Sequence, residues 1–147
     1  MDQKAAEAYT LALLARREYS SREIQEKLHY KGAQPKIITA VLQKFQQKGW
    51  QSDVRFAENL ISSKKNRYGV LKLSYLLEQK GIDKNIFESM LPDEEEELEL
   101  ALNLLYKKYP QKDTEDKEKH KRLRLLANHG FNIHCAYTAL KHYYRER

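Results

Sequence analysis

The chain has 147 residues, of which 33% are charged and 41% are hydrophobic, and its formal net charge at pH 7 is +6. A single cysteine, Cys135, excludes a disulfide within the chain, and no stretch of the sequence reaches the roughly 20 apolar residues that a membrane-spanning helix needs. The first residues also lack the apolar run of a signal peptide. We therefore expect a cytoplasmic protein with no membrane role, whose positive charge favours an acidic partner.

Helical periodicity dominates the first 50 residues. Apolar residues at three- and four-residue spacings predict a first helix whose inner face carries Ala8, Leu11, Ala12 and Ala15. Ser20 and Glu23 match a capping box, which predicts the start of a second helix. Gly32 is expected to end that helix, and Pro35 fits the first turn of a third helix.

The helical pattern continues through the middle of the chain. Asp53 is predicted to cap a helix, and Gly69 separates this helix from the next one. The second helix should end at Gly81, which we predict to have a left-handed backbone conformation. Asp83 is expected to cap a third helix that ends before Pro92.

The last part of the chain begins with an acidic block, Asp93–Glu97. We interpret this block as the solvated first turn of a helix, where carboxylates suit the positive end of the helix dipole. Two more helices are expected, one that ends at Gly130 and one that Asn132 caps. No useful length of sequence alternates with period two, so we expect no strands.

An internal repeat with a period of 49 residues organises these helices. The words that align without a gap are Leu28–Gly32, Leu77–Gly81 and Leu126–Gly130. Each unit is too short to bury a good core alone, so neighbouring units should stack. We predict an all-α protein, elongated and curved, built of three tandem three-helix repeats over residues 1–50, 51–92 and 93–147.

No arrangement of residues in the sequence points to catalysis. The chain has no phosphate-cradling glycine loop and no Gly-x-Ser-x-Gly turn. No pair of histidines has the helical spacing of a metal site with a carboxylate between its ligands. Cys135 aligns with Ile37 and Ile86 in the other repeats, so we interpret it as a core residue. We expect no enzymatic activity, no cofactor and no metal.

Basic residues mark one corner of each repeat. In the middle repeat, cations flank an aromatic residue and a glycine, a combination suited to phosphates or acidic protein surfaces, at Lys64, Lys65, Arg67, Tyr68 and Lys72. The corresponding residues are Arg16, Arg17 and Arg22 in the first repeat and Lys119, Lys121, Arg122 and Arg124 in the third. We predict that these corners bind a partner, although cations placed only for solubility would give the same pattern.

The order of several motifs resembles the RecX family of regulatory proteins, most strongly in the middle repeat. The motifs that carry the resemblance are Leu14–Ser20, Glu23–Leu28, Asp53–Ala57, Arg67–Gly69, Leu73, Leu77, Lys80–Ile82, Lys107–Tyr109 and Leu125–Phe131. The resemblance implies tandem three-helix repeats that bind the filament of the RecA recombinase on single-stranded DNA. It also implies inhibition of ATP hydrolysis, strand exchange and co-protease activity in DNA repair and the SOS response. We further expect a monomer with weak direct contact to DNA.

Two other functions remain open from the residues alone. Short second and third helices that meet at a glycine turn are typical of helix-turn-helix modules, so a DNA-binding regulator is one alternative. A helical scaffold without a nucleic-acid role is the other. The third helices share no row of base-reading side chains, which favours the filament over sequence-specific DNA reading.

Overall fold

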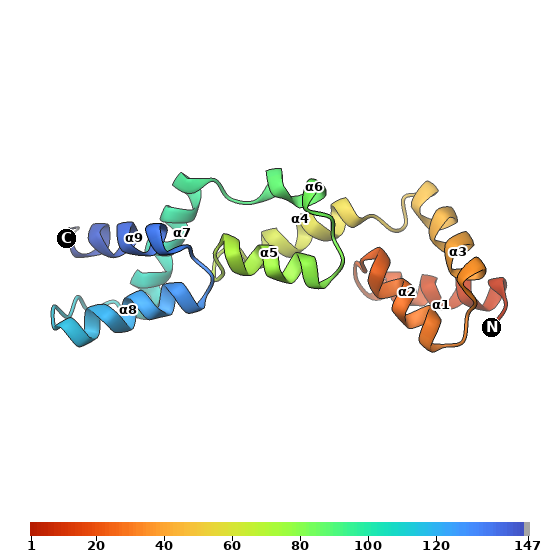
Figure 1. Cartoon of the computed structure of the whole chain (residues 1–147), viewed down its shortest axis with the longest axis horizontal. Coiled ribbons are helices and arrows are strands. Elements are labelled where there is room, and N and C mark those ends of the chain that lie inside the picture. The colour runs from red at the N-terminus through yellow and green to blue at the C-terminus, as the bar shows by residue number, and fades with distance from the viewer. Residues whose placement is uncertain (146–147) are drawn as a thin grey trace. The chain divides into compact units, whose positions relative to one another are not determined.

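The structure is a computed structural model that describes residues 1–145, and every regular element in this range is helical (Figure 1). The prediction of a chain without strands is therefore confirmed for these residues. The elements are α1 (Gln3–Arg16), α2 (Ser21–Tyr30), α3 (Pro35–Gln47), α4 (Asp53–Lys64), α5 (Val70–Gln79), α6 (Lys84–Phe87), the 3-10 helix η1 (Glu88–Met90), α7 (Glu94–Lys108), α8 (Asp116–Asn128) and α9 (Ile133–Arg145).

The helices form two compact units, and the middle repeat contributes to both. Unit 1 comprises Met1–Asn59 with Leu77–Glu88, and unit 2 comprises Leu60–Leu76 with Ser89–Arg147. The division falls inside α4 and α5. This division reflects which residues pack together and does not test the repeat boundaries, so residues 1–50, 51–92 and 93–147 remain predicted repeats.

In unit 1, α1, α2 and α3 pack against one another around an apolar core. The predicted inner face of α1 is wrong, because Ala8, Leu11, Ala12 and Ala15 are exposed. The buried residues of α1 are Ala6, Thr10 and Leu13. Thr10 can be buried because its hydroxyl donates a hydrogen bond to the backbone oxygen of Ala6 at 2.8 Å. The face of α1 that is buried includes a polar residue, Thr10, so the apolar pattern in the sequence indicated a different face.

Two sets of hydrogen bonds fix the start of α2, one within the helix and one to the start of α4. The predicted capping box is confirmed, because Ser20 and Glu23 exchange side-chain to backbone hydrogen bonds. The predicted cap at Asp53 is wrong: the hydroxyl of Ser52 accepts the bond from the α4 backbone, at 3.1 Å from the amide of Arg55. The carboxylate of Asp53 instead accepts a bond from the amide of Ser21, the first residue of α2, at 2.9 Å. Asp53 thus holds the start of α4 against the start of α2.

The turn after α5 also lies against the start of α2. The hydroxyl of Ser20 donates to the backbone oxygen of Lys80 at 2.7 Å. Gly81 has a φ of +76°, which confirms the predicted left-handed conformation. A Cβ atom on Gly81 would lie 2.7 Å from the Cβ of Arg22. The glycine is therefore required both by the backbone angle and by the close approach of α2.

In unit 2, α7, α8 and α9 pack against one another, and the turn after α8 lies against the start of α5. The amide of Gly69 donates to the backbone oxygen of His129 at 2.9 Å, and the amide of Leu71 donates to that of Gly130 at 3.0 Å. A Cβ atom on Gly69 would lie 2.4 Å from the backbone of Phe131. Gly69 thus permits two backbones to meet, and it repeats in unit 2 the docking of a turn on a helix start seen in unit 1.

The acidic block forms the first turn of α7, as expected, and the carboxylate of Asp93 caps it at 2.8 Å from the amide of Glu96. One residue departs from the expected solvated turn. Glu97 is only 3% exposed, and its carboxylate accepts hydrogen bonds from the amide of Val70 and from the side chain of Asn132. This carboxylate therefore belongs to the interior of unit 2.

Candidate partner-binding surface

A group of cations surrounds Tyr68 in unit 2, where the chain passes from α4 to α5. The atoms Lys64 Nζ, Arg67 Cζ and Lys72 Nζ lie 5.9, 5.1 and 5.1 Å from the centroid of the Tyr68 ring. The ring of His129 lies on the same tyrosine, with 5.9 Å between the ring centroids. We call these five residues the Tyr68 cluster. The bend at residues 65–69 brings the end of α4 and the start of α5 onto one aromatic ring.

The positive charges of the Tyr68 cluster are not neutralised by any carboxylate in the described part of the chain. Across residues 1–145, no ion pair joins Lys64, Arg67 or Lys72 to a carboxylate. Arg67 is exposed and Lys64, Tyr68 and Lys72 are half-buried, and contacts to the tyrosine face stabilise these cations without neutralising their charge. The three charges therefore remain free to bind oxyanions, and the ring adds a flat surface that loses little entropy on binding.

Lys65, which the sequence placed with this group, has a different partner. Its Nζ atom lies 2.9 Å from a carboxylate oxygen of Glu96 in α7. The structure thus brings four of the five predicted residues of this corner together and pairs the fifth with an acidic side chain. No sequence spacing pointed to Glu96, because the two residues are 31 positions apart.

The basic corner of the first repeat is divided in its contacts. Arg16 is exposed, whereas Arg17 pairs with Glu23 at 3.1 Å and stacks on Tyr19, with 3.6 Å from Cζ to the ring centroid. Burial raises the pKa of Glu23, but hydrogen bonds from Arg17, the Ser20 amide and Lys80 outweigh it and hold that pKa below its ordinary value. Glu23 is therefore an ionised, fully engaged partner at neutral pH.

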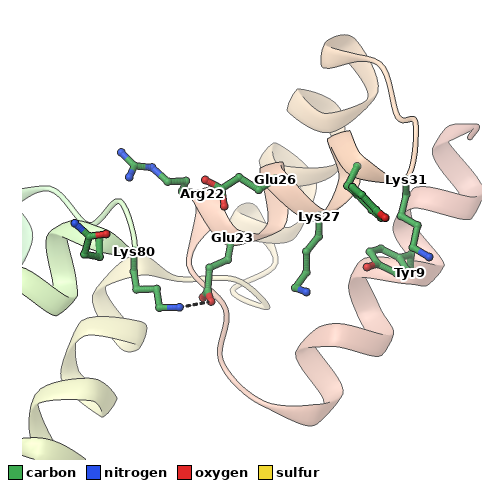
Figure 2. A pocket seen from close by; sticks show the side chains of 9 residues that line it. Tyr9, Arg22, Glu23, Glu26, Lys27, Lys31 and Lys80 are labelled. Carbon is green, nitrogen blue, oxygen red and sulfur yellow. Dashed lines mark hydrogen bonds and ion pairs between the residues drawn. The ribbon is translucent and has the colours of Figure 1, made fainter.

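Arg22 lines a cleft of about 420 Å³ in unit 1, which we call the α2 cleft (Figure 2). Its walls come from α1, from α2 and from the end of α5. The residues that line it include Tyr9, Arg22, Glu26, Lys27, Tyr30 and Lys31. Sequence reasoning identified only Arg22 among these. The spacing of Lys27, Tyr30 and Lys31, which places them on neighbouring turns at the end of one helix, could have indicated the others.

The basic corner of the third repeat requires a correction. Lys121 and Arg124 are exposed and Lys119 lies 5.1 Å from the centroid of Tyr144, but Arg122 is only 3% exposed. The guanidinium of Arg122 donates to the backbone oxygens of Gln111 and Glu118, at 2.8 and 2.9 Å. It also pairs with the Glu118 carboxylate at 3.0 Å.

Arg122 is therefore a structural residue and does not belong to a binding surface. The repeat register carried this information, because Arg122 aligns with Ile24 and Leu73, which are both fully buried. Because a guanidinium stays charged, its burial is tolerated only where acceptors surround it, and the loop before α8 and Glu118 of α8 supply them here.

Within residues 1–145 no group of three or more histidine, cysteine or acidic side chains is arranged to hold a metal ion. Cys135 is buried, and burial first, with Glu97 second, raises the pKa of its thiol to about 12. At neutral pH this thiol stays protonated and is a poor nucleophile. No helix in the described part of the chain is long and apolar enough to cross a membrane.

Comparison with known proteins identifies the family. Family models for the first, second and third three-helix domains of RecX match residues 6–45, 52–91 and 94–140, in that order. The chain belongs to the RecX family. This confirms the resemblance and the three tandem three-helix domains.

Named relatives and a solved RecX structure agree with this assignment. "Regulatory protein RecX" of Neisseria meningitidis serogroup C is 37% identical over 144 residues, which cover 98% of this chain and 94% of the relative. The protein of the same name from Mannheimia succiniciproducens is 39% identical over 129 residues, which cover 84% of each chain. The crystal structure of RecX from Lactobacillus salivarius has the same fold, with a TM-score of 0.85 and 20% identity over 98% of this chain and 97% of the other.

Proposed function

We propose that this RecX-family protein is a regulator that binds the RecA filament on single-stranded DNA and inhibits its ATPase, strand-exchange and co-protease activities. Its relatives are named regulatory proteins, which supports a regulatory role. The observation that carries the proposal is the Tyr68 cluster, whose three cations have no ion-pair partner among residues 1–145. A nucleoprotein filament offers phosphates and acidic side chains that would neutralise them.

The proposed action is binding without chemistry. A cytoplasmic monomer without cofactor, metal or catalytic activity would dock through the Tyr68 cluster and hold the filament in a state that hydrolyses ATP slowly. Exposed cations are interleaved with carboxylates such as Glu58 and Glu78, and Arg55 is paired with Glu18 at 2.7 Å. Mixed charge of this kind suits a protein groove better than a continuous track of phosphates. We therefore infer that binding to naked DNA is the weaker interaction.

A competition titration tests this proposal. Purified protein is added to preformed recombinase filament on single-stranded DNA, and ATP hydrolysis is followed at fixed, near-physiological salt. We expect inhibition that excess naked single strands relieve poorly, and that weakens as salt rises because counterions are displaced on binding. Relief by naked DNA at equal potency would contradict the filament preference. Tight, sequence-dependent binding to duplex DNA would instead favour a helix-turn-helix regulator.

A further inference from the structure

The α2 cleft of unit 1 is a second candidate binding site, and its chemistry differs from that of the Tyr68 cluster. Its volume of about 420 Å³ lies in the range of small-molecule sites. The proposed function makes no use of it. Two aromatic and several cationic side chains line it, most of them from α1 and α2.

One open aromatic ring, that of Tyr30, lines this cleft. Tyr30, the last residue of α2, is 88% exposed, and no ring in the described part of the chain stacks on it. Tyr9 from α1 lines the same cleft, and Lys31 Nζ lies 5.6 Å from the centroid of its ring (Figure 2). A large, flat and solvated ring beside cations is the arrangement on which nucleic-acid bases stack.

The charge of the cleft is positive once internal pairs are removed. Lys80 pairs with Glu23 at 3.1 Å, as the dashed line in Figure 2 shows, and Arg17 pairs with the same carboxylate. Over residues 1–145, the cations that line the cleft without an ion pair are Arg22, Lys27 and Lys31. Glu26 is the lining carboxylate that faces them. Three uncompensated cations against one carboxylate favour an anionic ligand.

The wall that carries Arg22 is held in place by the turn after α5. The stem of Arg22 lies over Gly81, where a side chain would clash, and the backbone of Lys80 is bound to Ser20 at 2.7 Å. These contacts lie within unit 1. The cleft is therefore a built feature of the fold.

We propose that the α2 cleft binds a nucleotide, with the base stacked on Tyr30 and the phosphate contacted by Lys27 and Lys31, one turn apart, while Arg22 adds positive charge at the other end of α2. An acidic peptide would use the cations but would leave the exposed tyrosine face without a flat partner, whereas a nucleotide uses both. The same chemistry could come from a nucleic-acid strand or from a free nucleotide. The inference stands apart from the proposed function, because the cleft lies in unit 1 and the Tyr68 cluster in unit 2.

The test uses the full chain with Lys64, Arg67 and Lys72 changed to alanine, so that the Tyr68 cluster does not contribute. Fluorescence anisotropy of a labelled thymidine 12-mer reports binding, and Tyr30→Ala is compared with Tyr75→Ala, a 57% exposed tyrosine outside the cleft. Tyr30→Ala should weaken binding at least about fivefold, since stacking on an aromatic side chain contributes on that scale per base. Tyr75→Ala should leave binding unchanged, and an abasic 12-mer should not respond to Tyr30→Ala.

Competitors identify the source of the nucleotide. Displacement of the probe by ATP supports a free nucleotide, and displacement only by unlabelled 12-mer supports a strand. Equal binding by the Tyr30 and Tyr75 variants, or equal displacement by polyglutamate, would overturn the proposal. ATPase inhibition by Tyr30→Ala in the otherwise natural chain is measured in parallel. If Tyr30→Ala weakens oligonucleotide binding but the natural protein does not inhibit filament ATP hydrolysis, the cleft proposal stands and only the proposed function is refuted.

Discussion

The carboxylate of Glu97 in α7 accepts a hydrogen bond from the backbone amide of Val70, the first residue of α5, at 2.8 Å. Its other oxygen accepts from the side chain of Asn132 at 3.0 Å. Asn132 in turn caps α9 through the amide of Cys135, at 2.8 Å. One buried carboxylate therefore satisfies the open amide at the start of α5 and orients the cap of α9.

This arrangement predicts a pH-dependent contribution to the stability of unit 2. Burial raises the pKa of Glu97 above 4.5, and repulsion from Glu94 adds to it, while hydrogen bonds from Val70 and Cys135 oppose the rise. A carboxyl whose folded pKa lies above its unfolded pKa stabilises fully below the unfolded value and loses that contribution as pH rises through the folded value. The free energy of unfolding of the natural protein minus that of Glu97→Gln should therefore fall as pH rises from below 4.5.

Thermal unfolding followed by circular dichroism over a pH series measures this difference. Glu95→Gln, an exposed position on the same helix, controls for the loss of a carboxylate from α7. If the difference in free energy of unfolding between the natural protein and Glu97→Gln stays constant or grows as pH rises, burial does not raise the pKa of Glu97.

Local signals in the sequence were sufficient for the helix ends. The capping box of Ser20 and Glu23, the cap at Asn132 and the left-handed Gly81 each depend on residues close in the chain, and each is confirmed. The family and its three-helix domains also followed from the order of short motifs.

Buried polar residues account for most of what the sequence could not predict. Thr10, Glu97 and Arg122 look like surface residues by type, yet each is buried because a hydrogen-bond partner satisfies it. For Glu97 the partner lies 27 residues away in the chain, and no local spacing reveals it. In the same way, Lys65 pairs with Glu96 only because the fold brings α7 close to the end of α4.

Gly81 and Gly32 separate backbone strain from crowding in unit 1. Both have positive φ, but a Cβ atom on Gly32 would meet nothing within 4 Å, whereas one on Gly81 would meet Arg22. Gly32→Ala should cost about 1–2 kcal/mol from the left-handed backbone alone. Gly81→Ala should cost about 1 kcal/mol more, because the stem of Arg22 must shift.

Urea unfolding followed by the fluorescence of Trp50, the only tryptophan of the chain and a residue of unit 1, checks this prediction. Equal losses in the two variants would show that the contact with Arg22 costs nothing.

Arg122→Ala should destabilise unit 2 by about 2–4 kcal/mol, because it removes a buried charged donor, leaves the Glu118 carboxylate without its partner and leaves the backbone oxygen of Gln111 with only the hydroxyl of Tyr143. Lys121→Ala, at the exposed neighbouring position, should change stability by less than about 0.5 kcal/mol. Thermal unfolding of both variants is the measurement. Similar melting temperatures for the two variants would show that Arg122 is not required for stability and would contradict its structural role.

In the function that we propose, the Tyr68 cluster docks this protein on the recombinase filament. The measurement is the protein concentration that halves filament ATP hydrolysis, compared between the natural chain, the variant with Lys64, Arg67 and Lys72 changed to alanine, and Lys65→Ala as the matched control. Because hydrogen bonds to charged groups contribute about 1.5–3 kcal/mol each, the triple variant should require at least roughly tenfold more protein. Lys65→Ala should act like the natural chain, since Lys65 is paired with Glu96. If the folded triple variant inhibits fully at the concentrations at which the natural chain does, the Tyr68 cluster does not dock the protein on the filament.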